Sequence, residues 1–409
     1  MSPLIRLLLL AVLVGWMPAG LAGESAPLPG SAPATVEPTA SRYRVTLATM
    51  APGQLYWERF GHNAIVVEDP EGRKVAFNFG YFDFEQPGFL RRFLFGEMRY
   101  LAVALDADTD LSHYVMAGRQ VWLQELDFSE AEARRLVGYL SRAVSPEERE
   151  YRYHYFRANC STRIRDAIDH ALDGALEDGF SHRSHGETWR RLALAHARQD
   201  LWMALGMHLG LGLPADEKLS RWQEFYIPAR LKDGLDDFRR ADSRPLVLAT
   251  RTLGGEGAYV HPYPPTWWPG FLAWGLAVSG LMVWAWNRAA LPQRRRLSAI
   301  GAILAFAFAS AGCFLMFLWA ATLHVDAGWN QNLFLLNPLW FAVAVLLWRE
   351  GGPRGLHLAA WGALVIAAGG SFLKVFPAFG QQSIEWVLAL LPVMAALLKM
   401  AGPLPERRA

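Results

Sequence analysis

Cys160 is the residue of this chain whose type and surroundings most clearly suggest chemistry. It lies in Tyr-Phe-Arg-Ala-Asn-Cys-Ser-Thr-Arg-Ile-Arg-Asp, and the other cysteine, Cys313, lies within an apolar stretch typical of a membrane span. The two thiols are expected in different solvents, so a disulfide between them is not expected. An unpaired thiol in an oxidising compartment is a liability unless it has a function. Cys160 is therefore a candidate nucleophile.

A thiol nucleophile also needs a base and a way to stabilise negative charge. The thiolate is the reactive form, and a helix N-terminus or a neighbouring histidine lowers the pKa of a thiol. If Cys160 begins a helix, the helix dipole stabilises the thiolate and the first free N–H groups bind an oxyanion. His62 is the best candidate for the base, because it precedes an apolar strand that can aim its imidazole.

These residues also have ordinary structural interpretations. A single buried cysteine is more often a small core residue than a nucleophile, and His62 alone would be an ordinary, partly buried histidine. Arg163 and Asp166 have the spacing of a salt bridge on a helix surface. His182 and His185 have the spacing of a metal pair, but a lone cysteine and no second pair make zinc a poor interpretation. Neither a metal nor another cofactor is expected.

The composition is that of a membrane protein. Hydrophobic residues make up 52% of the 409 residues and charged residues only 19%, which is too apolar for an ordinary soluble protein. About five membrane spans are predicted, several near the lower limit of about 17 residues. They are Phe271–Trp286, Ala299–Leu323, Leu333–Trp348, Leu356–Leu373 and Ile384–Leu398. No basic cluster precedes them, so nucleic-acid binding is not expected.

The N-terminus and the basic residues predict the orientation. Residues 1–22 have the pattern of an export signal, and residues 23–42 are expected to form a flexible leader. Nine basic residues in alternate loops and in the C-terminal tail, against Lys374 alone in the others, place the tail in the cytoplasm. Five spans then make this a multi-pass protein of the bacterial cytoplasmic (inner) membrane, with residues 43–265 in the periplasm and residues 266–409 forming the membrane domain.

The periplasmic part is predicted to be an α+β domain. Three short runs rich in Val, Ile and aromatic residues predict strands: Tyr43–Ala48, Ala64–Val67 and Val75–Phe79. Helical periodicity predicts helices over Ser129–Ala143, with Ser129 as the N-cap, and over Cys160–Leu172. A longer helical region is expected over Trp189–Leu211, with Gly206 as its break.

Several motifs along the chain carry a family resemblance. They are Phe60-Gly61-His62, Phe77–Phe84, Phe89, Gly96, Asn159–Asp166, Gly206–Pro214, Phe225–Pro228, His324, Asn332 and Asn337-Pro338. Together they resemble the Lnb-type lipoprotein N-acyltransferase family, and the first of them its N-terminal periplasmic domain. The Asn-Cys-x-Thr-Arg-x-Arg-Asp block is the most specific, and the resemblance covers most of the chain from Tyr43 onward.

The resemblance implies a fold and a reaction. The fold would be a circularly permuted papain-like domain, in which the histidine strand precedes the cysteine helix, followed by the helical membrane domain. Cys160 would be the nucleophile and His62 the general base. The supporting residues would be Asn159, Arg163, Asp166 and Asn63. As in the similar lecithin:retinol acyltransferase, an acyl chain would pass from a phospholipid to the thiol; the acceptor would be an amine, the N-terminus of a diacylglyceryl lipoprotein. The residue that orients the histidine is not identified by sequence.

Polar residues in the membrane part are costly and are functional candidates by default. Those near the external end of the second and third spans are His324, Asn330, Asn332 and Asn337. They either line a route for lipid or form interhelical hydrogen bonds.

Two other functions remain open. An exported papain-like domain is also typical of a cysteine peptidase or amidase that acts on cell-wall peptides. The third interpretation is a non-catalytic membrane sensor or binding module. The expected partners of the acyltransferase are a phospholipid donor, a lipoprotein or other amine acceptor, and the bilayer.

Overall fold

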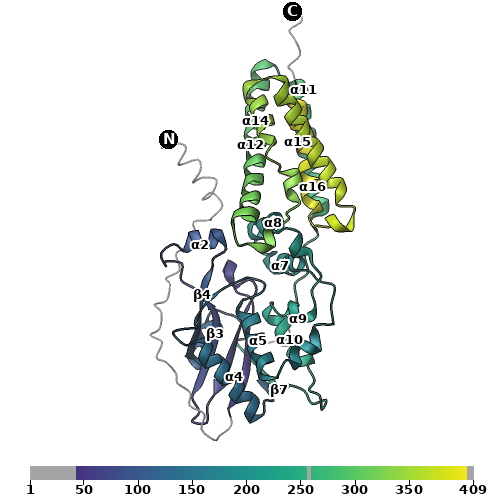
Figure 1. Ribbon diagram of the computed structural model, residues 1–409. Helices are drawn as coiled ribbons and strands as arrows, with labels where there is room; N and C mark the ends of the chain where they lie inside the picture. Colours follow the sequence, from purple (N-terminus) through teal and green to yellow (C-terminus); the bar gives the residue numbers. More distant parts are fainter. Residues whose placement is uncertain (1–42, 256–258, 403–409) are drawn as a thin grey trace, which may run out of the picture.

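The computed structural model describes residues 43–255 and 259–402. The predicted export signal and leader lie outside the described residues, as does the C-terminal tail from residue 403. Figure 1 shows a sheet domain at one end of the molecule and a bundle of long helices at the other. The site is therefore best understood from the sheet outward.

The sheet has seven antiparallel strands in the order β6-β4-β3-β2-β1-β5-β7. The strands are β1 (Arg44–Met50), β2 (His62–Glu68), β3 (Lys74–Tyr81), β4 (Arg99–Asp106), β5 (Val121–Leu126), β6 (Glu150–Arg152) and β7 (Val247–Leu253). The three strands predicted from sequence are confirmed as β1, β2 and β3.

Helices cover both faces of this sheet. Helices α4 (Glu130–Ala143) and α5 (Cys160–Ala171) pack on one face, in a core that includes Phe77 and Phe79 of β3. Helix α3 (Ala107–Met116) packs on the other face. Because successive strand residues point to opposite faces, Asn78, between the two phenylalanines, belongs to the α3 side.

Both predicted helices in this core are confirmed, and their starts are well capped. Ser129 accepts a hydrogen bond from the Glu132 N–H, and the Glu132 side chain bonds back to the Ser129 N–H. Such a capping box satisfies backbone donors that a helix start leaves unpaired.

The predicted long helix over Trp189–Leu211 is two helices, α7 (Trp189–Ala197) and α8 (Leu201–Gly210). The break lies at Asp200, whose side chain accepts a hydrogen bond from the Met203 N–H and caps α8. Gly206 lies inside α8, so the prediction of a break there was wrong. The capping aspartate was the stronger signal.

Shorter elements complete the sheet domain. They are η1 (Tyr56–Glu58), α2 (Phe89–Phe95), α6 (Ala175–Phe180), η2 (Leu213–Asp216), α9 (Arg221–Glu224) and α10 (Pro228–Asp237). In Figure 1, α2, α7 and α8 lie at the end of this domain that faces the long helices.

The bundle contains the helices predicted as membrane spans. They are α11 (Trp268–Arg288), α12 (Leu291–Ala321), α13 (Asn332–Leu335) continued by α14 (Trp340–Arg349), α15 (Arg354–Leu373) and α16 (Ile384–Met400). Four of them, with α13 and α14 taken as one, are long and apolar enough to cross a membrane. The predicted fifth span, α16, has 17 residues, or ~26 Å at 1.5 Å per residue. An α+β domain followed by membrane helices is thus confirmed.

Glycines allow the helix backbones of the bundle to approach closely. A Cβ at Gly312 of α12 would collide with the carbonyl oxygen of Leu336, and one at Gly275 of α11 with that of Leu388. By contrast, a Cβ at Gly280 would meet nothing within 4 Å. Small residues at such crossings are typical of helix packing in membranes.

Charge is distributed unequally between the two ends of the bundle. The far end, where α11 and α14 end and α12 and α15 begin, carries Arg288, Arg294, Arg295, Arg296, Arg349 and Arg354. There Arg295 pairs with Glu350, at 3.1 Å. At the near end, Asp326 in η3 (Val325–Ala327) pairs with Arg157 of the sheet domain, at 2.7 Å. A basic end remote from the sheet domain is what the positive-inside rule requires of a periplasmic sheet domain.

Candidate active site

Cys160 is the first residue of α5, and Asn159 is the N-cap of that helix. The Asn159 side chain accepts a hydrogen bond from the Thr162 N–H and donates to the carbonyl oxygens of Tyr155 and Tyr226. The Thr162 hydroxyl accepts from the Asn159 N–H at 2.8 Å. Asn159 therefore fixes the position from which Cys160 projects, and its amide is fully used in doing so.

The Cys160 sulfur lies against backbone donors. The N–H groups of Asn63, Ser161 and Cys160 itself are directed at it, and with the Arg119 guanidinium they lower the pKa of the thiol. Burial acts in the opposite direction and dominates, so the pKa is raised above its ordinary value. The helix start favours the thiolate as predicted, but the resting thiol is neutral. Cys160 as a residue is partly exposed.

The same backbone contact places the start of β2, where His62 lies, beside the start of α5. Asn63, whose N–H faces the sulfur, is the neighbour of His62 at the start of β2. Burial lowers the pKa of His62 to about 4; the hydrogen bond to Asn78 opposes this, and the charge of Arg119 adds to it. His62 is therefore a neutral imidazole at neutral pH, as a general base must be before it accepts a proton.

Asn78 determines which nitrogen of His62 carries the proton. Its side-chain oxygen lies 2.9 Å from Nε2 of His62, and its amide nitrogen donates to the carboxylate of Asp110 at 2.9 Å. Since Asp110 can only accept when it is ionised, the amide oxygen must face His62, and Nε2–H donates to it. Nδ1 is then the free acceptor of His62.

Two further residues enclose the imidazole. The Tyr114 ring stacks on His62 with ring centroids 5.9 Å apart. The Arg119 guanidinium lies 4.8 Å from the centre of the Tyr114 ring and donates to the Ala51 carbonyl oxygen and to Glu58. This arrangement holds a positive charge near both reactive groups, which favours a thiolate and disfavours an imidazolium.

The remaining predicted supporting residues lie around the start of α5 and β2. The Arg163 guanidinium lies over the rings of Phe79 and Tyr151, at 5.7 and 5.0 Å. Asp166 accepts from Arg165 at 2.6 Å, so the ion pair on this helix is Arg165–Asp166 instead of the Arg163–Asp166 pair that the spacing suggested. The Asn63 side chain donates to the Thr49 hydroxyl at 2.8 Å, so its backbone, not its amide, contacts the sulfur.

Both parts of the chain match known family domains. Residues 35–194 match the Lnb N-terminal periplasmic domain, and residues 265–402 match the Lnb transmembrane domain. The chain belongs to the Lnb family. It is a membrane protein with a periplasmic domain, and the family recognised from the motifs is confirmed. No curated protein and no solved structure shows a significant match to this Lnb chain.

The polar residues predicted near the membrane mostly join the bundle to the part of the chain that precedes it. Asn330 and Asn332 are buried, and both donate to the Leu209 carbonyl oxygen at the end of α8, at 2.9 Å. Asn337 donates to the carbonyl oxygens of Phe334 and Ala363. His324 lies 3.0 Å from the Phe93 carbonyl oxygen of α2. These contacts fit the hydrogen-bonding interpretation of the three asparagines, whereas His324 lies beside α2.

The histidine pair considered for zinc is not grouped with other ligands. His185 bonds through Nδ1 to Glu224 at 2.7 Å. Among residues 43–255 and 259–402, no group of three or more His, Cys, Asp or Glu side chains has the geometry to hold a metal ion.

Sequence reasoning missed Asn78, Asp110 and Arg119 as parts of this site. Asn78 carried a readable signal, because it is a polar residue between two phenylalanines in a strand expected to be buried. Asp110 and Arg119 carried none, since only the packing of α3 on the sheet brings them to His62.

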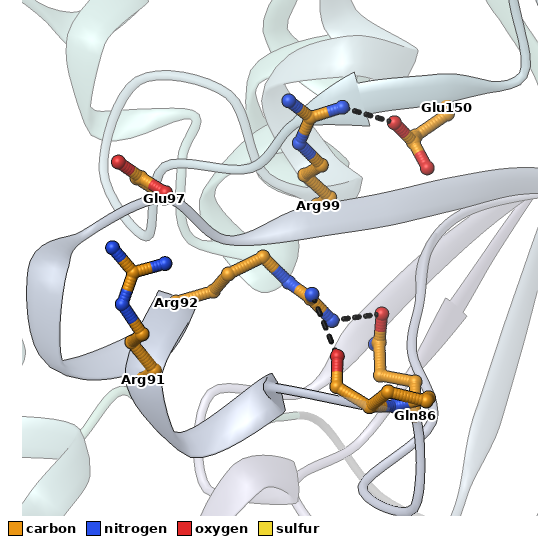
Figure 2. Close-up of a pocket in the computed structure, with 7 residues that line it drawn as sticks. Gln86, Arg91, Arg92, Glu97, Arg99 and Glu150 are labelled. Atoms are coloured by element: carbon orange, nitrogen blue, oxygen red, sulfur yellow. Dashed lines mark hydrogen bonds and ion pairs between the residues drawn. The ribbon is translucent and has the colours of Figure 1, made fainter.

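A charged pocket lies elsewhere on the Lnb periplasmic domain, beside α2 (Figure 2). It is lined by Gln86, Pro87, Arg91, Arg92, Glu97, Arg99 and Glu150. Arg99 is paired with Glu150 at 2.8 Å, and Arg92 donates to Gln86 at 2.6 Å. It contains no cysteine, serine or histidine among its lining residues, so Cys160 remains the candidate nucleophile.

Proposed function

We propose that this protein is a cysteine-dependent acyltransferase that moves an acyl chain from a phospholipid, through a thioester on Cys160, to an amine. The observation that carries the proposal is the position of the Cys160 sulfur. It lies at a capped helix start, against the N–H of Asn63, and Asn63 directly follows His62, whose acceptor nitrogen is set by Asn78. A nucleophile, a base and a base-orienting amide are the parts that thiol acyl transfer requires.

The first step is acylation of the thiol. Nδ1 of His62 takes the thiol proton as the sulfur attacks an ester carbonyl carbon of the phospholipid. The S–C bond forms, and backbone N–H groups at the start of α5 stabilise the oxyanion. The ester C–O bond then breaks, and the imidazolium returns the proton to the leaving oxygen, which gives a lysophospholipid.

The second step transfers the acyl group to an amine, which we propose to be the N-terminus of a diacylglyceryl lipoprotein. The amine nitrogen attacks the thioester carbon, the C–N bond forms, and the C–S bond breaks. A proton from the amine passes through His62 to the departing thiolate, which restores the resting thiol. A thioester is activated toward amines, so amide formation is downhill.

The attachment of the sheet domain to the bundle supports a lipid substrate. Asp326, between α12 and α13, accepts two hydrogen bonds from Arg157, at 2.7 and 2.8 Å, and lies 3.3 Å from His154. Cys160 follows Arg157 by one short turn of chain. The chain just before Cys160 is thus attached to the bundle, and this attachment supports substrates that reside in the bilayer, such as a phospholipid and a lipoprotein. We place this domain in the periplasm and the basic end of the bundle in the cytoplasm.

The test is a mass measurement on the full-length protein in phospholipid vesicles. Cys160 should gain the mass of one acyl chain, which hydroxylamine removes and which a synthetic diacylated lipopeptide discharges as it becomes triacylated. Cys160→Ser should not form this adduct, and Cys313→Ser, a matched control within the bundle, should form it normally.

Other outcomes separate the alternative functions. Cleavage of peptidoglycan fragments by the wild type, lost in Cys160→Ser and without any acyl adduct, would support the amidase. No adduct, no cleavage and an unchanged cell phenotype in Cys160→Ser would support the non-catalytic module.

A further inference from the structure

The membrane-facing end of the sheet domain carries a cluster of exposed apolar side chains. Its members have exposed fractions between 42% and 67%: Leu55, Tyr56, Trp57, Phe84, Leu90 and Phe93. We call these six residues the aromatic patch. They come from η1, from the segment before α2 and from α2 itself. Clustered apolar side chains on a protein surface mark a site of contact with a membrane, a ligand or another protein.

The aromatic patch is continuous with the membrane helices. The Phe95 ring of α2 contacts Phe317 of α12 with centroids 5.4 Å apart. The Leu323 N–H, after the end of α12, donates to the Phe95 carbonyl oxygen at 2.8 Å. Helix α2 therefore lies at the level where α12 leaves the membrane, beside the lower end of the bundle in Figure 1. The outer leaflet of the bilayer is the surface that meets it there.

Helix α2 also has the charge distribution of a helix at a lipid surface. Leu90 and Phe93 are exposed, while Arg91 and Arg92 line the charged pocket of Figure 2. Apolar groups that face acyl chains and arginines that face phosphate groups are typical of interfacial helices.

A line of aromatic rings leads from the patch toward Cys160. Its inner end is Tyr153, which is near enough to Cys160 for the charge of the thiolate to raise the pKa of this tyrosine, after the larger effect of burial. The Tyr153 ring stacks on Tyr100 with centroids 4.3 Å apart. Tyr100 in turn stacks on Phe82 at 4.9 Å.

From Phe82 the rings continue to the surface of α2. Phe82 contacts Phe84 at 4.8 Å, Phe84 contacts Phe89 at 5.2 Å, and Phe89 stacks on Phe93 at 6.2 Å. On the other side, Phe84 contacts Trp57 at 5.2 Å. The line of rings therefore runs without interruption from Tyr153 to side chains exposed at the end of the sheet domain that faces the bundle.

We propose that this line of rings, from Tyr153 to Phe93, binds an acyl chain of the donor phospholipid and guides its ester from the outer leaflet to Cys160. The inference rests on the proposed function and adds the site that holds the donor. A row of aromatic side chains suits this role, because the parts of the rings not covered by one another form an apolar surface for methylene groups.

The test compares two acyl donors in single-turnover acylation of Cys160. One donor is a phospholipid with two 16-carbon chains in vesicles, and the other is a water-soluble butyryl thioester. The double variant Leu90→Ser/Phe93→Ser should react at least about tenfold more slowly with the vesicle lipid, because two apolar contacts are lost. Its rate with the butyryl thioester should equal that of the wild type, which also shows that the variant is folded.

The matched control is Leu248→Ser. Leu248 is similarly exposed, at 57% against 67% for Leu90, but it lies on β7, at the opposite edge of the sheet from β6. Its rates with both donors should be those of the wild type. If the α2 variant keeps the wild-type rate with vesicles, the inference is wrong while the proposed function stands. If the wild type is acylated by neither donor, the proposed function itself fails.

Photo-crosslinking provides a readout independent of catalysis. A phospholipid with a diazirine at the end of one acyl chain should label the peptide that contains Phe82–Phe93, both in the wild type and in Cys160→Ser. Labelling confined to the bundle helices in both proteins would overturn the inference.

Discussion

The side-chain oxygen of Asn78 accepts a hydrogen bond from Nε2–H of His62. Because the Asn78 amide nitrogen is held by Asp110, the imidazole is confined to the tautomer whose Nδ1 is free. A general base contributes about 10²–10⁴ to a rate, and part of that depends on this tautomer. We expect Asn78→Ala to lower the rate constant of Cys160 acylation by about ten- to a hundredfold, with little change in KM.

Rapid-mix mass spectrometry of the acyl-enzyme would measure this rate constant. Asn63→Ala is the matched control, since it keeps the backbone N–H that faces the sulfur. A similar loss of kcat in both variants would mean that Asn78 acts on the fold and not on His62.

The pH dependence of acylation should reflect the lowered pKa of His62, about 4. Only the neutral imidazole accepts a proton, so activity is retained above this pKa and lost as the pH falls through it. The acylation rate should stay flat from about pH 8 to pH 5 and fall near pH 4, whereas an ordinary histidine would lose activity near pH 6.5. The hydrogen bond to Asn78 raises the pKa of His62. In Asn78→Ala this bond is absent and the pKa of His62 is lower, so the loss of activity should move to lower pH. A midpoint near 6.5 in the wild type would contradict the buried, neutral imidazole.

Removing Asp326 should weaken the junction between the two domains. This carboxylate is fully buried and pairs with Arg157, which keeps 40% of its side chain exposed. Breaking a fully buried pair costs about 3–5 kcal/mol, and we expect about 2–3 kcal/mol here because Arg157 stays in contact with water. Thermal unfolding in detergent would measure the loss for Asp326→Ala. Glu130→Gln, which removes an exposed pair with Arg134, should cost less than about 1 kcal/mol.

The close crossing at Gly312 predicts a large effect from one methyl group. In Gly312→Ala the new Cβ meets the Leu336 carbonyl oxygen, so α12 must shift, at a cost of about 1–3 kcal/mol. Gly280→Ala lies in an open position of α11 and should be neutral or slightly stabilising. Melting temperatures of the two variants in the same detergent test this contrast. Equal values would mean that the helices do not approach at Gly312.

The orientation in the membrane is testable with single cysteines in a Cys160→Ser/Cys313→Ser background. Asp108→Cys, in the sheet domain, should react with a membrane-impermeant maleimide in intact spheroplasts. Arg354→Cys, at the basic end of the bundle, should react only after lysis. The reverse pattern would invert the proposed topology.

The sequence predicted structure well where a residue type or a local pattern favours one kind of element. The asparagine before Cys160 predicted a helix start, and it forms one. The apolar spans predicted the bundle, although α16 has 17 residues and is shorter than the four helices that meet the length for a span. Asp200 and Gly206 were both possible positions for the break in the helical region over Trp189–Leu211. The break lies at Asp200, because its side chain caps α8.

What the sequence did not provide were contacts between distant segments. Asp110 reaches Asn78 across 32 residues, and Arg157 reaches Asp326 across 169. Neither pair has a local pattern, because each depends on how whole helices pack. The raised pKa of the Cys160 thiol was not predicted for a similar reason. It results mainly from burial, and the cost of burying a charge depends on the surrounding fold.

The ion pairs between Asp326 and the chain just before Cys160 have a consequence for where this protein can react. They set the height of the sulfur above the lipid surface, because that height is measured from the bundle's own η3 turn. A bilayer of different thickness would raise or lower the whole bundle, and the thiol with it, relative to the glycerol esters. Lipid composition would then change the rate of the proposed acylation without any ligand being bound.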